Sequence, residues 1–127
     1  MVEYVGGGDS GTGITSIGSG KDYSTIAAWI ASLSDGTYSS GDDIIGELYD
    51  SSYDEAFNIG DAPFSIGGLN SVTLRANSAY KHDGTPDSGV KITYSGSVPD
   101  SSAPYTVSYD SSTYGEYKVK IEDIEFA

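Results

Sequence analysis

Adjacent carboxylates are the residues of this chain whose chemistry is most easily recognised. They occur at Asp42-Asp43, Asp54-Glu55 and Glu122-Asp123. Glycoside hydrolysis needs two carboxyl groups about 5–9 Å apart across a cleft. Neighbouring residues of a strand point to opposite faces of the sheet, and a chain with 19 acidic residues contains such pairs by chance. We therefore interpret the pairs as solvated surface groups.

Two basic side chains are the remaining candidates for proton transfer. His82 is the only histidine and stands in the polar segment 81–84. Arg75 is the only arginine, and its place in the apolar segment 72–76 makes it an outward-facing strand residue. We interpret His82 as a loop residue and Arg75 as a charge partner for a neighbouring strand. No catalytic residue is predicted, so we expect that the protein is not an enzyme.

The N-terminal glycines match a nucleotide-binding motif only in their spacing. Gly6, Gly8 and Gly11 have the spacing of a dinucleotide-binding pattern. That pattern needs a buried strand before it and a helix whose N-terminus holds the pyrophosphate. Residues 12–20 lack the apolar spacing of a helix. We instead interpret residues 1–20 as a flexible arm rich in glycine, and residues 21–127 as a single β-rich domain.

Metal-binding residue types are scarce. The chain contains no cysteine and one histidine, which excludes thiolate zinc sites and clusters of imidazole ligands. We therefore expect no cofactor. Bound calcium is the less favoured alternative, because carboxylates in turns suit a hard cation. Its candidate ligands are Asp42, Asp43, Asp83 and Asp87.

Tyrosine is the most abundant aromatic residue, with 11 copies. Its ring can stack on a sugar, but it also favours strands and interfaces because it combines a large apolar area with a hydroxyl group. We favour packing and subunit contact, and glycan binding is the alternative. The candidates for an exposed strip are Tyr49, Tyr53, Tyr94, Tyr105, Tyr109, Tyr114 and Tyr117.

Composition and charge restrict the class of protein and its partners. A chain of 127 residues has room for one domain. Its net charge of −13 disfavours contact with nucleic acid and with anionic membrane surfaces. No apolar stretch approaches the roughly 20 residues of a membrane-spanning helix. The N-terminus also lacks the basic head and apolar stretch of a secretory signal.

One amphipathic helix is predicted at about residues 24–34. Its apolar side chains recur at helical spacing, so they form one stripe that must cover other apolar groups. Asp22 or Ser24 is expected to cap the N-terminus, and Gly36 stands where a left-handed residue ends a helix. The stripe that we expect to cap the strand core consists of Ile26, Trp29, Ile30 and Leu33.

After the helix, apolar residues recur with the period of two that is typical of strands. In the last run this alternation shifts phase after Glu122-Asp123, which predicts a tight bend or a bulge. The predicted strands are 44–49, 56–59, 71–76, 90–94, 105–109 and 117–126.

This order of elements resembles the N-terminal part of right-handed parallel β-helix proteins, the pectin-lyase-like group found in phage particles and on bacterial surfaces. The resemblance implies an all-β fold with one short helix, in which the helix plugs the end of a short solenoid; a small β-sandwich is the alternative. Members of the group normally have many more coils than the two or three that fit here. The segments that carry the resemblance are 21–29 (KDYSTIAAW), 45–50 (IGELYD), 72–76 (VTLRA) and 89–92 (GVKI).

The last apolar run is expected to form an interface. Strand edges offer unpaired backbone groups that proteins usually pair or cover. At −13 per chain, a ring around a symmetry axis keeps acidic loops apart, so we expect a homo-oligomer and prefer a trimer. The predicted interface residues are Tyr117, Val119, Ile121, Ile124 and Phe126.

These observations favour a structural protein, namely a phage virion component such as a capsid decoration protein or a tail or fibre element. Its partners would be other virion proteins or further copies of itself. A virion location would reconcile the Ser-, Thr- and Tyr-rich composition of a surface protein with an N-terminus that does not resemble an export signal, and so would the loss of an export signal from a longer chain. The alternatives are a carbohydrate-binding module of an adhesin, located outside the cell or on its surface, and the N-terminal piece of a polysaccharide lyase or hydrolase.

Overall fold

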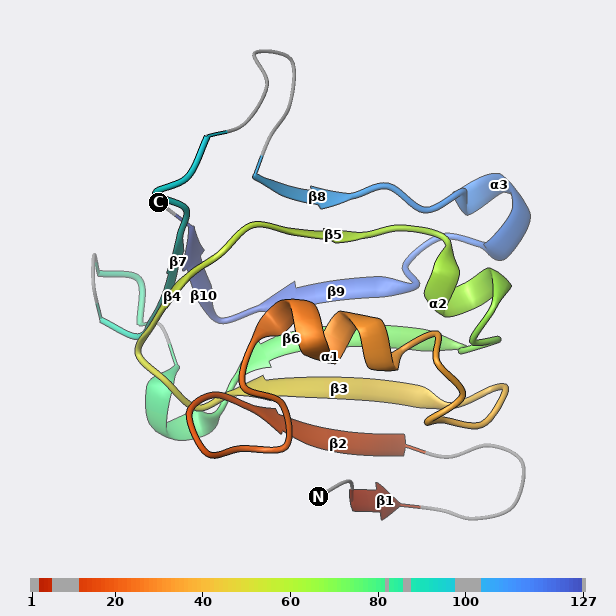
Figure 1. Ribbon diagram of the computed structural model, residues 1–127, viewed down its shortest axis with the longest axis horizontal. Helices are drawn as coiled ribbons and strands as arrows, with labels where there is room; N and C mark the ends of the chain where they lie inside the picture. Colours follow the sequence, from red (N-terminus) through yellow and green to blue (C-terminus); the bar gives the residue numbers. More distant parts are fainter. Residues whose placement is uncertain (1–2, 6–11, 82, 86–87, 98–103, 127) are drawn as a thin grey trace.

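The computed structural model describes residues 3–5, 12–81, 83–85, 88–97 and 104–126. Most of its regular structure consists of short strands, joined by a few short helices (Figure 1). The strands are β1 (Glu3–Val5), β2 (Thr12–Ile17), β3 (Asp43–Leu48), β4 (Ser52–Asp54), β5 (Phe57–Ile59), β6 (Ser71–Ala76), β7 (Val90–Thr93), β8 (Tyr105–Val107), β9 (Val119–Glu122) and β10 (Ile124–Phe126). The helices are α1 (Ile26–Ser32), α2 (Ala62–Ser65), α3 (Ser111–Tyr114) and the 3-10 turn η1 (Ser78–Tyr80).

The strands form three sheets that the chain visits in a repeating order. Sheet A has the order β1-β2-β3-β6-β9, sheet B has β10-β7-β4, and sheet C pairs β5 with β8. Each pairing is parallel except that of β1 with β2. The passes β3-β4-β5, β6-β7-β8 and β9-β10 therefore lie one above another, and we call each pass a layer (Figure 1). Parallel pairing also differs from the β-sandwich alternative, whose sheets are antiparallel.

The core consists of inward-facing side chains that stack from layer to layer. Residues facing inward in one strand of sheet A are paired with inward-facing residues of the next strand, because the register is kept. The rows in sheet A are Gly13–Ile44–Val72–Val119, Thr15–Gly46–Leu74–Ile121 and Ile17–Leu48–Ala76. Sheet B adds Tyr53, Val90 and Ile92, and sheet C adds Phe57 and Ile59.

Helix α1 covers this core beside sheet C, where it contacts β5 (Figure 1). Ile26, Trp29 and Leu33 are buried, and Ile30 is partly buried against the same cluster. The Trp29 indole lies directly over Gly46, since a Cβ atom built on that glycine would come within 2.5 Å of Trp29 Cε2. The burial of the stripe agrees with the sequence prediction, and a small residue in β3 makes room for the large one in α1.

The N-terminus of α1 is capped by residues that the sequence did not indicate. Thr25 is the N-cap, and its Oγ1 accepts a hydrogen bond from Ala28 N at 3.0 Å. The Glu55 carboxylate, between β4 and β5, accepts hydrogen bonds from Ile26 N at 3.1 Å and Ala27 N at 2.9 Å. The prediction of Asp22 or Ser24 as the cap is therefore wrong. Asp22 instead accepts from the backbone N–H of Ser16.

Removing the Glu55 cap should loosen the contact between α1 and sheet C. We expect Glu55→Ala to lower the free energy of unfolding by about 1–2 kcal/mol, because two backbone donors lose their acceptor. Glu55→Gln keeps one acceptor oxygen and should lower the free energy of unfolding by less than Glu55→Ala does. Urea denaturation followed by tryptophan fluorescence measures both. Equal stability of Glu55→Ala and the wild type would contradict the long-range cap.

Other differences concern segments whose sequence pattern is weak. Residues 12–17 form β2 inside sheet A, so the predicted flexible arm over 1–20 is wrong for this segment; residues 1–2 and 6–11 lie outside the described part. Strand β4 and the short helices α2 and α3 were not predicted. The predicted bend after Glu122 is confirmed, since Asp123, at a φ of 61°, separates β9 from β10.

Candidate functional site

The two ends of the stacked layers are built differently. At one end the outermost strands are β1, which pairs antiparallel with β2, β4 of sheet B and β5 of sheet C, and α1 lies beside β5. At the other end β9, β10 and β8 are the outermost strands of sheets A, B and C. Within the described residues each of these three strands has a partner on one side only. We call this end, formed by β8, β9 and β10, the open end.

An apolar hollow of about 250 Å³ lies at the open end. Its aromatic rings pack against one another: the Tyr105 ring centroid lies 5.0 Å from that of Phe126 and 5.7 Å from that of Phe57. The Tyr105 hydroxyl donates to Ile92 O at 3.2 Å, so its ring is held in place. The hollow is lined by Phe57, Tyr105, Thr106, Val107, Ile121 and Phe126. Such a surface is suited to being covered by another apolar surface.

The structure brings most of the predicted interface residues to this end. Ile121 and Phe126 line the hollow, while Val119 and Ile124 pack partly buried against the core. Tyr117 is separate: it lies in the turn before β9 with a positive φ of 61°, and it is 83 % exposed. These contacts lie within one chain and do not test the interface, which stays a prediction.

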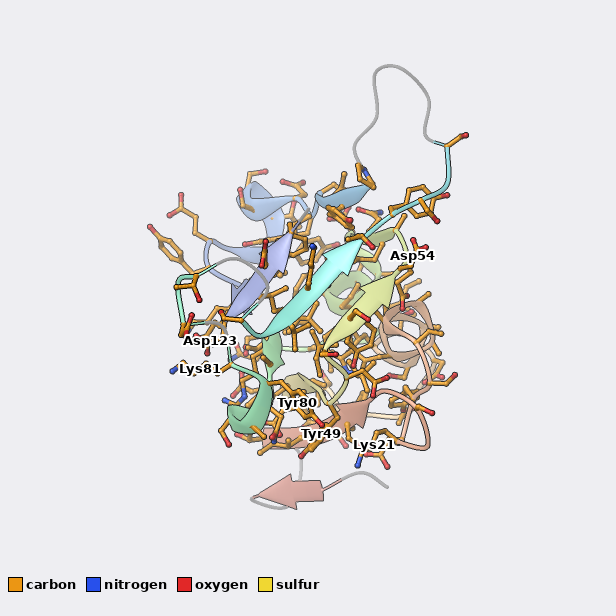
Figure 2. All side chains as sticks on the ribbon, turned by 90° about the vertical axis from the view of Figure 1, so that its left-hand side faces the viewer. Lys21, Tyr49, Asp54, Tyr80, Lys81 and Asp123 are labelled. Atoms are coloured by element: carbon orange, nitrogen blue, oxygen red, sulfur yellow. The ribbon has the colours of Figure 1, made fainter. Side chains whose placement is uncertain are left out.

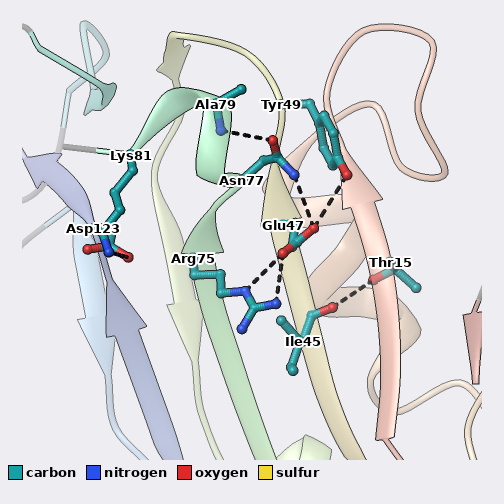
Figure 3. Close-up of polar contacts among 9 residues, drawn as sticks. All are labelled: Thr15, Ile45, Glu47, Tyr49, Arg75, Asn77, Ala79, Lys81 and Asp123. Atoms are coloured by element: carbon teal, nitrogen blue, oxygen red, sulfur yellow. Dashed lines mark hydrogen bonds and ion pairs between the residues drawn. The ribbon is translucent and has the colours of Figure 1, made fainter. Parts of the chain in front are cut away.

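A second, polar site lies on the outer face of sheet A, around Glu47 (Figure 3). Glu47 Oε2 accepts from Arg75 Nε at 3.0 Å and from Nη2 at 2.8 Å. Its other oxygen accepts from the Tyr49 hydroxyl and the Asn77 amide, both at 3.4 Å. The predicted role of Arg75 as a charge partner for a neighbouring strand is therefore confirmed, since Glu47 belongs to β3 and Arg75 to β6.

This polar site continues into a shallow depression of about 370 Å³. Lys81 and Asp123 point toward one another there, with 3.8 Å between Nζ and Oδ2 (Figures 2 and 3). Nearby, the Lys21 ammonium lies 4.6 Å from the centroid of the Tyr49 ring. The depression is lined by Glu47, Arg75, Ala76, Ser78, Lys81, Glu122 and Asp123. These residues were not predicted to form a group, although alternation along 44–49 and 72–76 places Glu47, Tyr49 and Arg75 on one face.

The tyrosines do not form one exposed strip. Tyr53 is buried, Tyr105 packs in the aromatic hollow, and Tyr109 and Tyr114 pack against Phe64 with ring centroids 5.1 and 6.2 Å away. Four of the seven candidates therefore serve packing. The remaining candidates lie in different parts of the fold: Tyr49 directly follows β3, Tyr94 directly follows β7, and Tyr117 lies in the turn before β9.

Burial also shifts a tyrosine ionisation. The Tyr53 hydroxyl donates to Ile17 O at 2.7 Å and accepts from Tyr49 N and Asp50 N at 3.2 and 3.1 Å. Burial raises the pKa of Tyr53 to about 12, from an ordinary value of 10.0. Burial likewise raises the pKa of Tyr38 and of Tyr105.

These shifts predict alkaline destabilisation. A raised pKa in the folded state means that the unfolded chain loses the proton first, so the stability falls as the pH rises. We expect the free energy of unfolding to be constant up to about pH 10 and to decrease between about pH 10 and 12. Urea denaturation across this range measures it, with Tyr53→Phe as the comparison. A fall that is as steep in Tyr53→Phe as in the wild type would contradict the assignment to Tyr53.

The other candidates from the sequence have structural contacts. Asp54 accepts from Ser95 N and Oγ, which lowers its pKa, and Glu55 caps α1. Asp43 accepts from Asn70 and Ser71. His82 and Asp87 lie outside the described residues. In the part of the chain that the structure describes, no three His, Cys, Asp or Glu side chains are grouped to hold a metal ion.

Comparisons with models of known protein families, with curated proteins and with solved structures found no match. Over the same described ranges, no helix is both long and apolar enough to cross a membrane.

Proposed function

We propose that this protein is a non-enzymatic structural component of a phage virion, such as a capsid decoration protein or a tail or fibre element. Its scaffold would be a short right-handed parallel β-helix capped by α1. The support for this scaffold is that β3-β4-β5, β6-β7-β8 and β9-β10 enter three parallel sheets in the same order. Six pairings keep strand direction and register from layer to layer.

The observation that carries the functional proposal is the difference between the two ends. At one end α1 lies beside β5 with its apolar stripe buried in the core, while the open end presents three strand edges around an apolar hollow. Exposed strand edges are natural templates for pairing with another chain. The open end therefore serves for docking on further copies or on another virion protein.

The experiment is the solution mass of the purified protein, measured by light scattering across protein concentration and ionic strength. Self-association should occur, and Ile121→Asp should abolish it by placing a charge in the hollow. Glu116→Lys, an exposed substitution in the turn before β9, should leave the mass unchanged. A wild-type protein that stays monomeric at high concentration, alone and with the material that co-purifies with it, would contradict the proposal.

Glycan binding is the second candidate, favoured by the polar depression beside Tyr49. Carboxylates, a guanidinium group and an amide are the groups that bind sugar hydroxyls, and an aromatic ring lies next to them. Titration with neutral and acidic oligosaccharides, followed by amide NMR shifts, tests it. Shifts confined to β3 and β6 that vanish in Tyr49→Ala would support binding, whereas no shift at millimolar sugar would exclude it.

A further inference from the structure

The edge of β9 carries side chains of opposite charge. Lys120 and Glu122 are exposed on the outer face of sheet A, and neither side chain has a hydrogen bond or ion pair with another described residue. Lys118, by contrast, donates to Asn70 Oδ1 at 3.2 Å. Two of the six basic residues of the chain thus lie on or next to this strand. These two lysines lower the repulsion that a second copy, itself at −13, meets at this edge.

The backbone of β9 fixes which of its groups point away from the fold. Val72 N donates to Lys118 O at 2.8 Å, so the polar backbone groups of residue 118 face β6. Because these groups alternate in direction along a strand, those of Lys120 and Glu122 also face β6. The N–H and C=O groups of Val119 and Ile121 then face the open edge. The backbone N–H and C=O of Ile121 are therefore central among the groups of β9 that a second chain could pair with.

Antiparallel pairing of two β9 strands around Ile121 satisfies both the backbone and the charges. Ile121 of each copy would exchange two hydrogen bonds with Ile121 of the other, the pattern of a hydrogen-bonded pair. Lys120 of each copy then lies opposite Glu122 of the other, on the same face of the joined sheet. A register centred on Lys120 is less suitable, since it places the two Lys120 side chains opposite each other.

The same two-fold arrangement places the apolar hollows together. A rotation axis normal to sheet A at Ile121 keeps the inner faces of both sheets on the same side. Ile121, whose side chain lines the hollow, would therefore meet its equivalent across the interface. Lysine on an edge strand usually discourages further pairing, but here every Lys120 finds a glutamate in the partner.

We propose that a second copy of this chain docks on β9 in antiparallel orientation, with Lys120 opposite Glu122 and a two-fold axis at Ile121. This inference rests on the proposed function insofar as both place assembly at the open end. It goes further by naming the partner, the register and a dimer, in place of the trimer preferred from the sequence.

Charge reversal tests the register. Lys120→Glu places two glutamates opposite each other, and Glu122→Lys places two lysines opposite each other. The homodimer of each single variant should have a dissociation constant about tenfold higher than that of the wild type, because two cross-strand pairs become repulsive. The double variant Lys120→Glu/Glu122→Lys should dimerise like the wild type. An equimolar mixture of the two single variants should form a heterodimer, since each strand again faces its opposite charge.

Glu122→Lys is the most discriminating variant because it makes the chain less acidic. If only overall repulsion mattered, this change would favour association, whereas the proposed register predicts dissociation. Lys21→Glu and Glu116→Lys change net charge equally but lie outside β9 and should leave the dimer intact.

Sedimentation velocity on the wild type, the variants and the mixture distinguishes the outcomes. A wild-type dimer, weakened single variants and restored association in the double variant and the mixture would support the inference. Three outcomes would overturn the inference but not the proposed function: a wild-type trimer or larger species, single variants that associate like the wild type, or weakened single variants whose association is restored neither in the double variant nor in the mixture. A wild type that is monomeric at every concentration and salt would overturn both the inference and self-association.

Discussion

Replacing Trp29 by alanine is expected to lower the free energy of unfolding by about 3–5 kcal/mol. The indole is 0 % exposed and packs over β3 within the cluster of buried apolar side chains. Its removal leaves a cavity that α1 and sheet A cannot easily close by moving together, because both are anchored by their own hydrogen bonds. Urea denaturation followed by circular dichroism gives the value.

Two control variants test whether this loss of stability comes from emptying the buried Trp29 site. Ile66→Ala removes an apolar side chain that is 73 % exposed, and should change stability by less than about 0.5 kcal/mol. Trp29→Phe should cost much less than Trp29→Ala, since it keeps a ring and removes an indole N–H that has no hydrogen-bond acceptor among the described residues. A solvent-exposed emission spectrum of the single tryptophan, or an unchanged stability of Trp29→Ala, would refute the role of α1 as a cap.

Gly46→Ala is expected to destabilise the protein by about 1–3 kcal/mol through overpacking. The new methyl group would lie 2.5 Å from Trp29 Cε2 and 2.9 Å from Ile17 Cδ1, distances that require the indole or the strand to shift. The position is also inside sheet A, between Thr15 and Leu74 of the neighbouring strands, so the backbone cannot easily move.

A double-mutant cycle identifies the contact responsible. In the Trp29→Ala background the methyl group of Gly46→Ala would enter the vacated space, so the second substitution should cost little or even stabilise the protein. Gly60→Ala is a suitable control, because its methyl group would make only ordinary contacts at 3.5 and 3.7 Å. Equal costs of Gly46→Ala in both backgrounds would show that the indole is not the obstacle.

The elements with strong periodicity were predictable, and those held by tertiary contacts were not. The stripe of α1 and the alternation in β3, β6 and β7 follow from apolar spacing, which persists because each strand has one inward face. Strand β2 was not predicted, because its inward-facing residues Gly13 and Thr15 are not markedly apolar. Its place in sheet A depends on pairing with β3, which local sequence does not encode.

The candidate site was predictable in part for a similar reason. Ile121 and Phe126 could be singled out because they belong to one apolar run, and both line the hollow. Their role in an interface stays a prediction. Their meeting with Tyr105 and Phe57 could not be foreseen, since it depends on how three layers align across all three sheets. The cap from Glu55 is likewise a contact over 29 residues from Ile26, beyond the reach of local capping rules.

The central claim, that the open end is a docking surface, is tested most directly by hydrogen exchange at the Ile121 amide. That N–H faces the open edge, so a docked partner would protect it. We predict that its exchange slows as protein concentration rises, whereas the amide of Leu74, inside sheet A, exchanges at a constant rate. Exchange at Ile121 that is fast and independent of concentration, in a folded protein, would contradict the claim.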